Sequence, residues 1–275
     1  MDNNIRTYLV ELIATFLLVL ISAGAVCASQ LIQENQPQPG LAGIALAIGV
    51  ATAVAVAFSF AYDGGFVNPA ITLMLWVVQR FDGKKTSALI FVQCLGAALA
   101  GGLLRLVLGS NTLTMKFARL GTPHVQFEAL GYPGSGFGAL MISILLELGL
   151  TFVLAVIVFA VLVDRRFTDK LPATPVWLCP IWIGLVAAGL TLAAFNFTGA
   201  AMNPARWFGT FVWELTVPTL KETAGIDAVV YLVGPIAGTM VLGFLIYFDL
   251  LFGEVSGAKK ESHAEGKHKQ HAAAS

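Results

Sequence analysis

The chain has 275 residues, of which 57% are hydrophobic and only 12% are charged, and its mean hydropathy is +0.81. Length alone would allow one or two soluble domains, but the charged residues are crowded into short segments between long apolar runs. That pattern is typical of a helical protein that crosses a membrane several times. The formal net charge is zero, so composition gives no support for nucleic acid or an acidic partner.

The first half of the chain predicts three membrane-spanning helices. Apolar runs at about 8–29, 41–60 and 87–108 are each long enough to cross a bilayer, which takes roughly 20 residues. A shorter apolar run lies between the second and the third of them. We therefore expect 6–108 to form one structural unit.

The second half repeats this plan after a long connection. Residues 109–138 contain several glycines and prolines, which favours a link between two halves over another span. Three more spans follow, and the polar, basic stretch at the end of the chain is expected to be a disordered tail. The expected second repeat is 139–252 with spans at 139–163, 176–195 and 228–252, the single domain is 1–252, and the tail is 253–275.

One tripeptide occurs in both halves, as Asn68-Pro69-Ala70 and as Asn203-Pro204-Ala205. Asn is a favoured helix N-cap, and Pro is favoured at the first helical position, so each tripeptide predicts the start of a helix. The apolar runs that follow, 71–78 and 207–212, are too short to cross a bilayer. We interpret both as re-entrant half-helices.

A second repeated pattern supports an internal duplication. Glu11 is followed by Thr15-Phe16 and stands 57 residues before Asn68, and Glu147 is followed by Thr151-Phe152 and stands 56 residues before Asn203. An internal duplication of this kind places the working site where the halves meet, near the middle of the membrane.

Lysine and arginine positions predict the orientation of the chain, because cytoplasmic loops are enriched in them. With both termini in the cytoplasm, eleven of the sixteen lie on the cytoplasmic side. The two half-helices then enter from opposite sides, which predicts inverted repeats. The eleven are Arg6, Arg80, Lys84, Lys85, Arg165, Arg166, Lys170, Lys259, Lys260, Lys267 and Lys269.

The N-termini of the two half-helices are expected to face each other and to determine which molecules can pass between them. Each carries a partial positive charge, so cations and hydronium are repelled where they meet. A small neutral molecule meets no such barrier, and the Asn68 and Asn203 amides can donate hydrogen bonds to its oxygen. Arg206, a lone charge in an apolar stretch, is predicted to line the same passage, with a salt-bridged arginine at the outer interface as the alternative.

Glu11 and Glu147 are the other ionisable residues predicted to lie within the membrane. A proton relay is one interpretation of them. A structural role is favoured, because both occupy matching repeat positions and can accept hydrogen bonds from the unpaired N–H groups of the re-entrant segments.

The chain resembles the major intrinsic proteins, the aquaporins and aquaglyceroporins, over about residues 8–252. The resemblance rests on Glu11 with Thr15-Phe16, on 64–72 and 199–206 around the two tripeptides, and on Val233-Gly234-Pro235. It implies a homotetramer with one pore per subunit, passive conduction, and no cofactor. The separate cysteines, Cys27, Cys94 and Cys179, are interpreted as buried apolar residues and not as metal ligands.

The resemblance also implies a second constriction built from four positions. They fall here on Ile48, Thr191, Ala200 and Arg206. Water-selective and glycerol-conducting members carry bulkier sets at these positions, so a wider, more apolar ring is expected. Three further sites differ from the residues typical of both water-selective and glycerol-conducting members. They are Phe66, Trp207 and Tyr231-Leu232.

The expected function is a passive channel in the plasma membrane for water and small uncharged solutes such as glycerol, urea or a metalloid acid. Strict water selectivity is the closest alternative. An ion-coupled secondary transporter and a poorly conducting junction protein are further alternatives. An enzyme is not expected, because no nucleophile, base or metal cluster converges in the apolar core.

Overall fold

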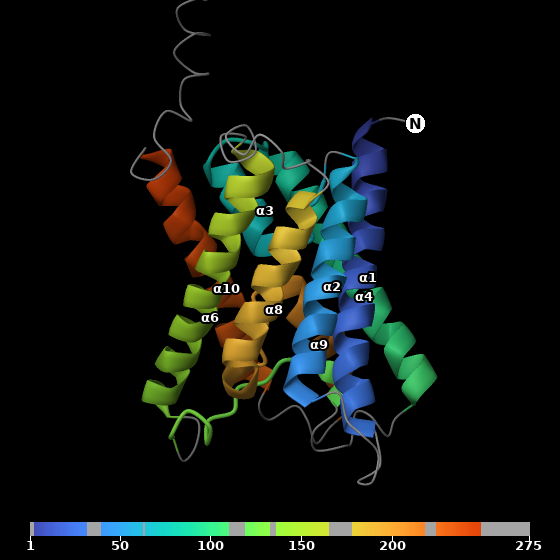
Figure 1. Cartoon of the computed structure of the whole chain (residues 1–275), viewed down its shortest axis with the longest axis vertical. Helices are drawn as coiled ribbons and strands as arrows, with labels where there is room; N and C mark the ends of the chain where they lie inside the picture. Colours follow the sequence, from blue (N-terminus) through green and yellow to red (C-terminus); the bar gives the residue numbers. More distant parts are fainter. Residues whose placement is uncertain are drawn as a thin grey trace, which may run out of the picture.

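A computed structural model describes residues 3–31, 40–62, 64–109, 119–132, 136–164, 178–217 and 224–248. In these ranges the chain is helical, without a strand, and it contains six helices long and apolar enough to cross a membrane (Figure 1). The prediction of an all-α membrane protein with six spans is confirmed. The six are α1 (Asn3–Leu31), α2 (Gly40–Phe60), α4 (Gly83–Leu108), α6 (Phe137–Val158), α8 (Cys179–Thr198) and α10 (Ala224–Tyr247).

Helix α6 continues into a π-helical turn, η2 (Phe159–Val163), so this span covers nearly the predicted 139–163. Helix α4 begins earlier than predicted, because Asp82 caps it by accepting a hydrogen bond from Lys85 N at 2.8 Å. Helix α8 ends three residues later than predicted, where Gly199 adopts a left-handed conformation with φ of 71°. The predicted tail, 253–275, lies outside the described residues.

Two short helices begin at the tripeptides, as predicted. They are α3 (Pro69–Val77) and α9 (Pro204–Glu214), and α9 is longer than expected because Trp213 and Glu214 extend it. α3 lies toward the end of the bundle where α1 begins and α10 ends, and α9 lies toward the opposite end (Figure 1). Together with the order of the helices, this confirms the inverted repeat.

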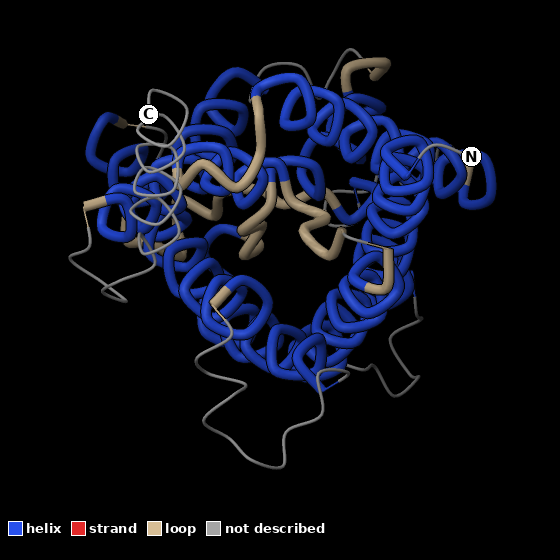
Figure 2. The backbone as a smooth tube through the Cα atoms, turned by 90° about the horizontal axis from the view of Figure 1, so that it is seen from above, coloured by secondary structure: helices blue, strands red, loops and turns tan. Residues whose placement is uncertain are grey.

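The long helices form a ring, and non-helical segments lie near its middle (Figure 2). Small residues allow close approach where the repeats meet. A Cβ added at Gly49 of α2 would lie 2.6 Å from Gly184 O of α8. In the same way, a Cβ at Gly209 of α9 would meet Ala97 O of α4. Each half-helix also packs on a long helix of the other repeat, α3 on α10 and α9 on α4. The two halves therefore share one core.

The described part of the connection, 119–132, packs onto the bundle. It contains the short 3₁₀ turn η1 (Arg119–Gly121), and its Leu120 side chain is fully buried against α1, α4 and α9 residues. Gln126 N donates to Phe197 O at 2.8 Å. The connection thus contacts the C-terminal end of α8, close to the second tripeptide.

Candidate functional site

The two tripeptides meet in the middle of the bundle. Asn68 Nδ2 donates to Met202 O at 2.9 Å, and Asn203 Nδ2 donates to Val67 O at 2.7 Å. Each Asn therefore donates to the residue that precedes the other Asn. An amide carries two N–H donors, so each Asn keeps one for a further acceptor.

The same asparagines cap the half-helices. Asn68 Oδ1 accepts from Ala70 N at 3.0 Å, and Asn203 Oδ1 accepts from Ala205 N at 2.9 Å. An N-cap contact of this kind is worth about 1 kcal/mol. Because capping uses the amide oxygen, the amide nitrogen of each Asn is held pointing out of its own helix.

The backbone before each Asn is in an unusual conformation. Val67 and Met202 have φ of 42° and 51°, in the left-handed region that disfavours residues with a side chain. Three residues before each Asn, Gly65 and Ala200 also have positive φ, at 102° and 45°. For Val67, Met202 and Ala200, which carry a side chain, such conformations cost roughly 1–3 kcal/mol each and persist only where the surroundings hold them, whereas Gly65 adopts positive φ without this cost. Here they direct the Val67 and Met202 carbonyls toward the opposite asparagine.

Glu11 holds the first of these segments. Its fully buried carboxylate accepts hydrogen bonds from the backbone N–H groups of Gly65, Phe66 and Val67 at 2.8, 3.1 and 3.0 Å. Gln93 Nε2 of α4 also donates to it, at 2.7 Å. Three N–H groups that no helix or strand would pair are therefore satisfied by one side chain.

Glu147 does the same for the second segment. It is fully buried and accepts from Ala201 N at 3.0 Å, Met202 N at 2.8 Å and Thr198 Oγ1 at 2.6 Å. Thr198 O accepts in turn from Tyr231 Oη at 2.6 Å. Sequence reasoning did not find Gln93 or Thr198, although a polar Gln in an apolar span was visible at position 93. It noted Tyr231 as a departure from both channel types but gave it no role in holding this segment.

A cavity lies beside both asparagines and is lined by sixteen residues. Fourteen of them form seven repeat-related pairs, separated by 135 or 136 positions, so both halves contribute equally. The seven pairs are Leu18 and Leu154, Ile48 and Ile183, Thr52 and Ala187, Phe66 and Ala201, Val67 and Met202, Asn68 and Asn203, and Ile71 and Arg206; Val56 and Val158 complete the lining.

Arg206 is the one charged residue among those that line this cavity. Its Nη1 donates to Ala200 O at 2.8 Å and to Gly199 O at 3.3 Å, which fixes the guanidinium against its own re-entrant segment. Its buried Nη2 has no hydrogen-bond partner among the described residues. The guanidinium therefore keeps unused donor capacity.

The four positions expected at the second constriction are not all at this cavity. Ile48 and Arg206 line it, together with both asparagines. Thr191 and Ala200 are fully buried and do not line it. The Thr191 hydroxyl donates to Ala187 O at 2.7 Å within its own helix, and Ala200 contributes its carbonyl to Arg206.

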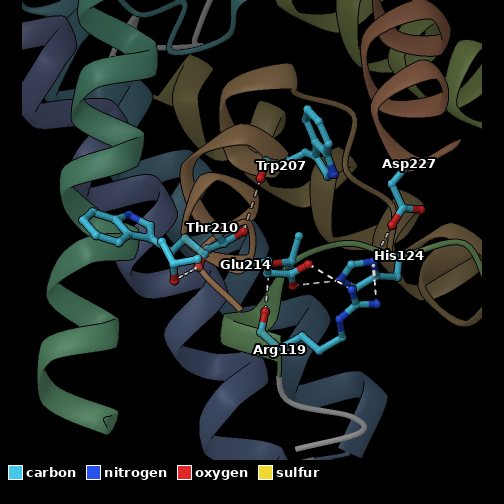
Figure 3. A network of polar contacts seen from close by, with 9 residues as sticks. Arg119, His124, Trp207, Thr210, Glu214 and Asp227 are labelled. Carbon is cyan, nitrogen blue, oxygen red and sulfur yellow. Dashed lines mark hydrogen bonds and ion pairs between the residues drawn. The ribbon is translucent and has the colours of Figure 1, made fainter. Parts of the chain in front are cut away.

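A polar cluster that sequence reasoning missed lies near the C-terminal end of α9. It joins Arg119 and His124 of the connection, Glu214 of α9 and Asp227 of α10 (Figure 3). The two acidic residues lie at the ends of apolar helical runs, and this position was the signal in the sequence that could have pointed to the cluster. The carboxylates contact different nitrogens of the imidazole, so the groups do not converge on one point, and within the described ranges no metal-binding group is found.

Comparisons with known proteins agree with this geometry. The family model described as Major intrinsic protein matches residues 1–247. A protein described as aquaporin TIP4-4 of Zea mays is 33% identical, with 91% of this chain and 88% of that protein covered. A probable aquaporin AqpM of Archaeoglobus fulgidus is 29% identical, over 87% of this chain and 95% of its own length.

The fold is also similar to a solved structure. The aquaglyceroporin from Plasmodium falciparum matches with a TM-score of 0.71 at 21% identity, over 90% of this chain and 97% of that one. The match of the family model over nearly the whole chain, on a helical bundle with two capped half-helices, shows that the protein belongs to the major intrinsic protein family.

Proposed function

We propose that the protein is a passive membrane channel for water and small uncharged solutes such as glycerol, urea or a metalloid acid. The observation that carries this is the meeting of Asn68 and Asn203 at one cavity, each with an amide N–H left to donate. An oxygen of the permeating molecule can accept from both in turn. Relatives described as aquaporins are consistent with water as a permeant.

Exclusion of protons and cations follows from charge. The N-termini of α3 and α9 each carry roughly half a positive charge, and Arg206 adds a full one at the same cavity. A cation entering a narrow apolar passage loses hydration and meets repulsion from all three. A neutral molecule loses only hydrogen bonds, which the asparagines and Arg206 partly replace.

Passage of small solutes besides water is supported by the cavity lining. Twelve of its sixteen residues are apolar, and the polar ones are Thr52, Asn68, Asn203 and Arg206. A mostly apolar wall with few donors suits molecules that have carbon as well as oxygen. The small or aliphatic residues Ile48, Thr191 and Ala200 at the expected constriction would leave room for them.

The two buried glutamates fit a structural role better than ion coupling. Backbone N–H groups occupy both carboxylates, and neither residue lines the cavity. An ion-coupled transporter would need at least one of them exposed to the passage. We further propose that the protein forms a homotetramer in the plasma membrane and that both its termini lie in the cytoplasm. The start of α1 and the end of α10 lie at the same end of the bundle, which supports placing both termini on one side of the membrane (Figure 1).

The test is flux through the purified full-length protein in proteoliposomes. Stopped-flow light scattering is recorded with an impermeant osmolyte for water and then with inward glycerol and urea gradients. Leu106→Ala, at a side chain that is 81% exposed, controls for protein amount and reconstitution, and empty liposomes give the background. Water and solute fluxes above background are expected. Fast water flux with background solute flux would establish strict water selectivity instead, and background flux of both would refute the channel.

A further inference from the structure

The polar cluster joins three parts of the chain that are distant in sequence. His124 Nδ1 lies 2.7 Å from Asp227 Oδ2, His124 Nε2 lies 3.0 Å from Glu214 Oε1, and Arg119 Nη2 lies 3.1 Å from Glu214 Oε2 (Figure 3). The side chains are largely buried, with 12% of His124, 2% of Glu214 and 6% of Asp227 exposed. Ion pairs this well shielded are screened far less than surface pairs.

The geometry favours a protonated histidine. Both ring nitrogens face a carboxylate oxygen, and only the imidazolium has an N–H on each of them. Protonation also makes the net charge of the cluster zero, because two positive side chains, Arg119 and His124, then face two carboxylates, Glu214 and Asp227. Burial lowers the pKa of His124, but the hydrogen bonds and charges of Asp227 and Glu214 outweigh it and raise the pKa above its ordinary value. The 3.2 Å approach of Arg119 Nη1 to Nδ1 is then a contact between two donors, which Asp227 and Glu214 offset.

The segment that carries His124, residues 119–126, is hereafter the strap. It lies on the backbone that holds Arg206. A Cβ added at Gly199 would lie 2.9 Å from Pro123 Cα, and Gln126 N donates to Phe197 O. Gly199 O and Ala200 O are the two acceptors of Arg206 Nη1. Any movement of the strap therefore reaches the carbonyls that orient the guanidinium.

The strap is held by apolar contacts as well as by the polar cluster. Val125 packs in a cluster with Trp207, Phe211 and Tyr231, and Leu120 packs against α1 and α4. At the level of the polar cluster, by contrast, the contacts from the strap to α9 and α10 are ionic. With a neutral imidazole, one carboxylate would face a nitrogen lone pair, and the cluster would carry a net negative charge in a shielded place.

We propose that His124 is a positioning residue for Arg206, and that its positive charge keeps the strap docked so that permeation falls when the imidazole loses its proton at alkaline pH. This rests on the channel function and on the place of Arg206 in the passage proposed above. The charged groups that face His124 are Arg119 from the strap, Glu214 from α9 and Asp227 from α10. Tyr231 of α10 donates its hydroxyl to Thr198 O, and Glu128, further along the connection, is exposed.

The direction of the pH dependence follows from the raised pKa of His124. Docking favours the protonated ring, so its stabilising effect is complete below the ordinary histidine pKa of about 6.5 and is lost as pH rises through the raised value. Undocking frees the Gly199 and Ala200 carbonyls to move, and Arg206 can then swing into the cavity. Each unit by which docking raises the pKa changes the docked-to-undocked ratio tenfold, so we expect water permeability to fall by roughly threefold or more between about pH 6 and about pH 9.

The experiment uses the full chain in which the three histidines near its C-terminal end are changed together, His263→Gln, His268→Gln and His271→Gln. His124 is then the one histidine left in the sequence. Its titration is followed by NMR of the imidazole, and water permeability is measured in proteoliposomes over the same pH range. His124→Gln keeps a polar side chain but cannot charge, Asp227→Asn removes one facing carboxylate, and Glu128→Gln removes an exposed carboxylate from the same connection.

We expect His124 to titrate above its ordinary pKa, with the fall in permeability centred on the same pH. Asp227→Asn should lower both midpoints together, Glu128→Gln should leave them unchanged, and His124→Gln should give a flat, low profile. A parallel, unchanged profile in His124→Gln, or a flat profile in the parent, would overturn the inference. Background water flux at every pH would instead refute the channel itself, and the NMR titration would still report on the His124 charge.

Discussion

The two re-entrant segments, 64–77 and 199–214, are built alike but differ at the cavity. In both, an Asn caps the half-helix, the residue before it has positive φ, and a buried glutamate pairs the backbone N–H groups. Three positions after each Asn, however, the first segment presents Ile71 and the second presents Arg206. Duplication has therefore kept the scaffold in both halves, and one half alone supplies the charge.

The support behind the glutamates also differs. Gly96 of α4 packs on the backbone of Leu12 and Phe16, and Gly238 of α10 packs in the same way on Leu148 and Phe152. By this equivalence, Gln93 in α4 corresponds to Pro235 in α10. A hydroxyl from the end of the preceding long helix donates to each glutamate, Ser59 Oγ to Glu11 and Thr198 Oγ1 to Glu147. Gln93 also donates to Glu11, whereas Pro235 has no side-chain donor. Both segments are thus held by their own flanks, and the first has one further donor from a neighbouring helix.

The largest expected effect comes from removing the glutamates. Each change to Leu leaves two backbone N–H groups unpaired, those of Phe66 and Val67 or those of Ala201 and Met202, because Gly65 N keeps its bond to Ser59 Oγ. Each unpaired group costs roughly 1–3 kcal/mol. Both Glu11→Leu and Glu147→Leu should therefore be strongly destabilised, and to a similar extent. Thermal unfolding in detergent measures this, with Glu128→Leu at an exposed position as the control. If both variants melt like that control, the segments do not depend on the carboxylates.

The Ile71 and Arg206 pair gives the next largest effect. Arg206→Val makes the second segment resemble the first and should raise proton flux roughly tenfold, because losing one buried charge lowers the barrier by on the order of 1–2 kcal/mol. Ile71→Val is the matched change in the other half. Proton flux is read with a pH-sensitive dye inside proteoliposomes. Equal flux in both variants and the parent would remove Arg206 from its proposed role.

A smaller effect is expected at Ile48 and Ile183, which line the same cavity from repeat-related positions. Ile48 belongs to the expected constriction and Ile183 does not. Ile48→Phe should therefore reduce glycerol flux several-fold more than water flux, whereas Ile183→Phe should reduce both alike. The ratio of glycerol to water permeability separates these results. Identical ratios in the two variants would argue that no constriction distinguishes the halves.

Much of the fold was determined by the sequence, because the forces involved act over short distances along the chain. Apolar runs long enough to cross a bilayer predicted the six spans, and Asn-Pro-Ala capping predicted where α3 and α9 begin. The spacing of Glu11 and Glu147 from their asparagines also predicted the repeat. Helix ends were less well predicted, since a side-chain cap such as Asp82 adds a turn that hydropathy does not show.

Only the tertiary structure decided which groups meet across the bundle. The hydrogen bonds from Asn68 to Met202 and from Asn203 to Val67 join residues more than a hundred positions apart, and so does the contact of His124 with Asp227. No local propensity specifies such pairs. They depend on which helices pack together and at what depth, and close approach at glycines such as Gly49 and Gly184 sets that packing. The folded bundle therefore fixed the cavity and its single charge.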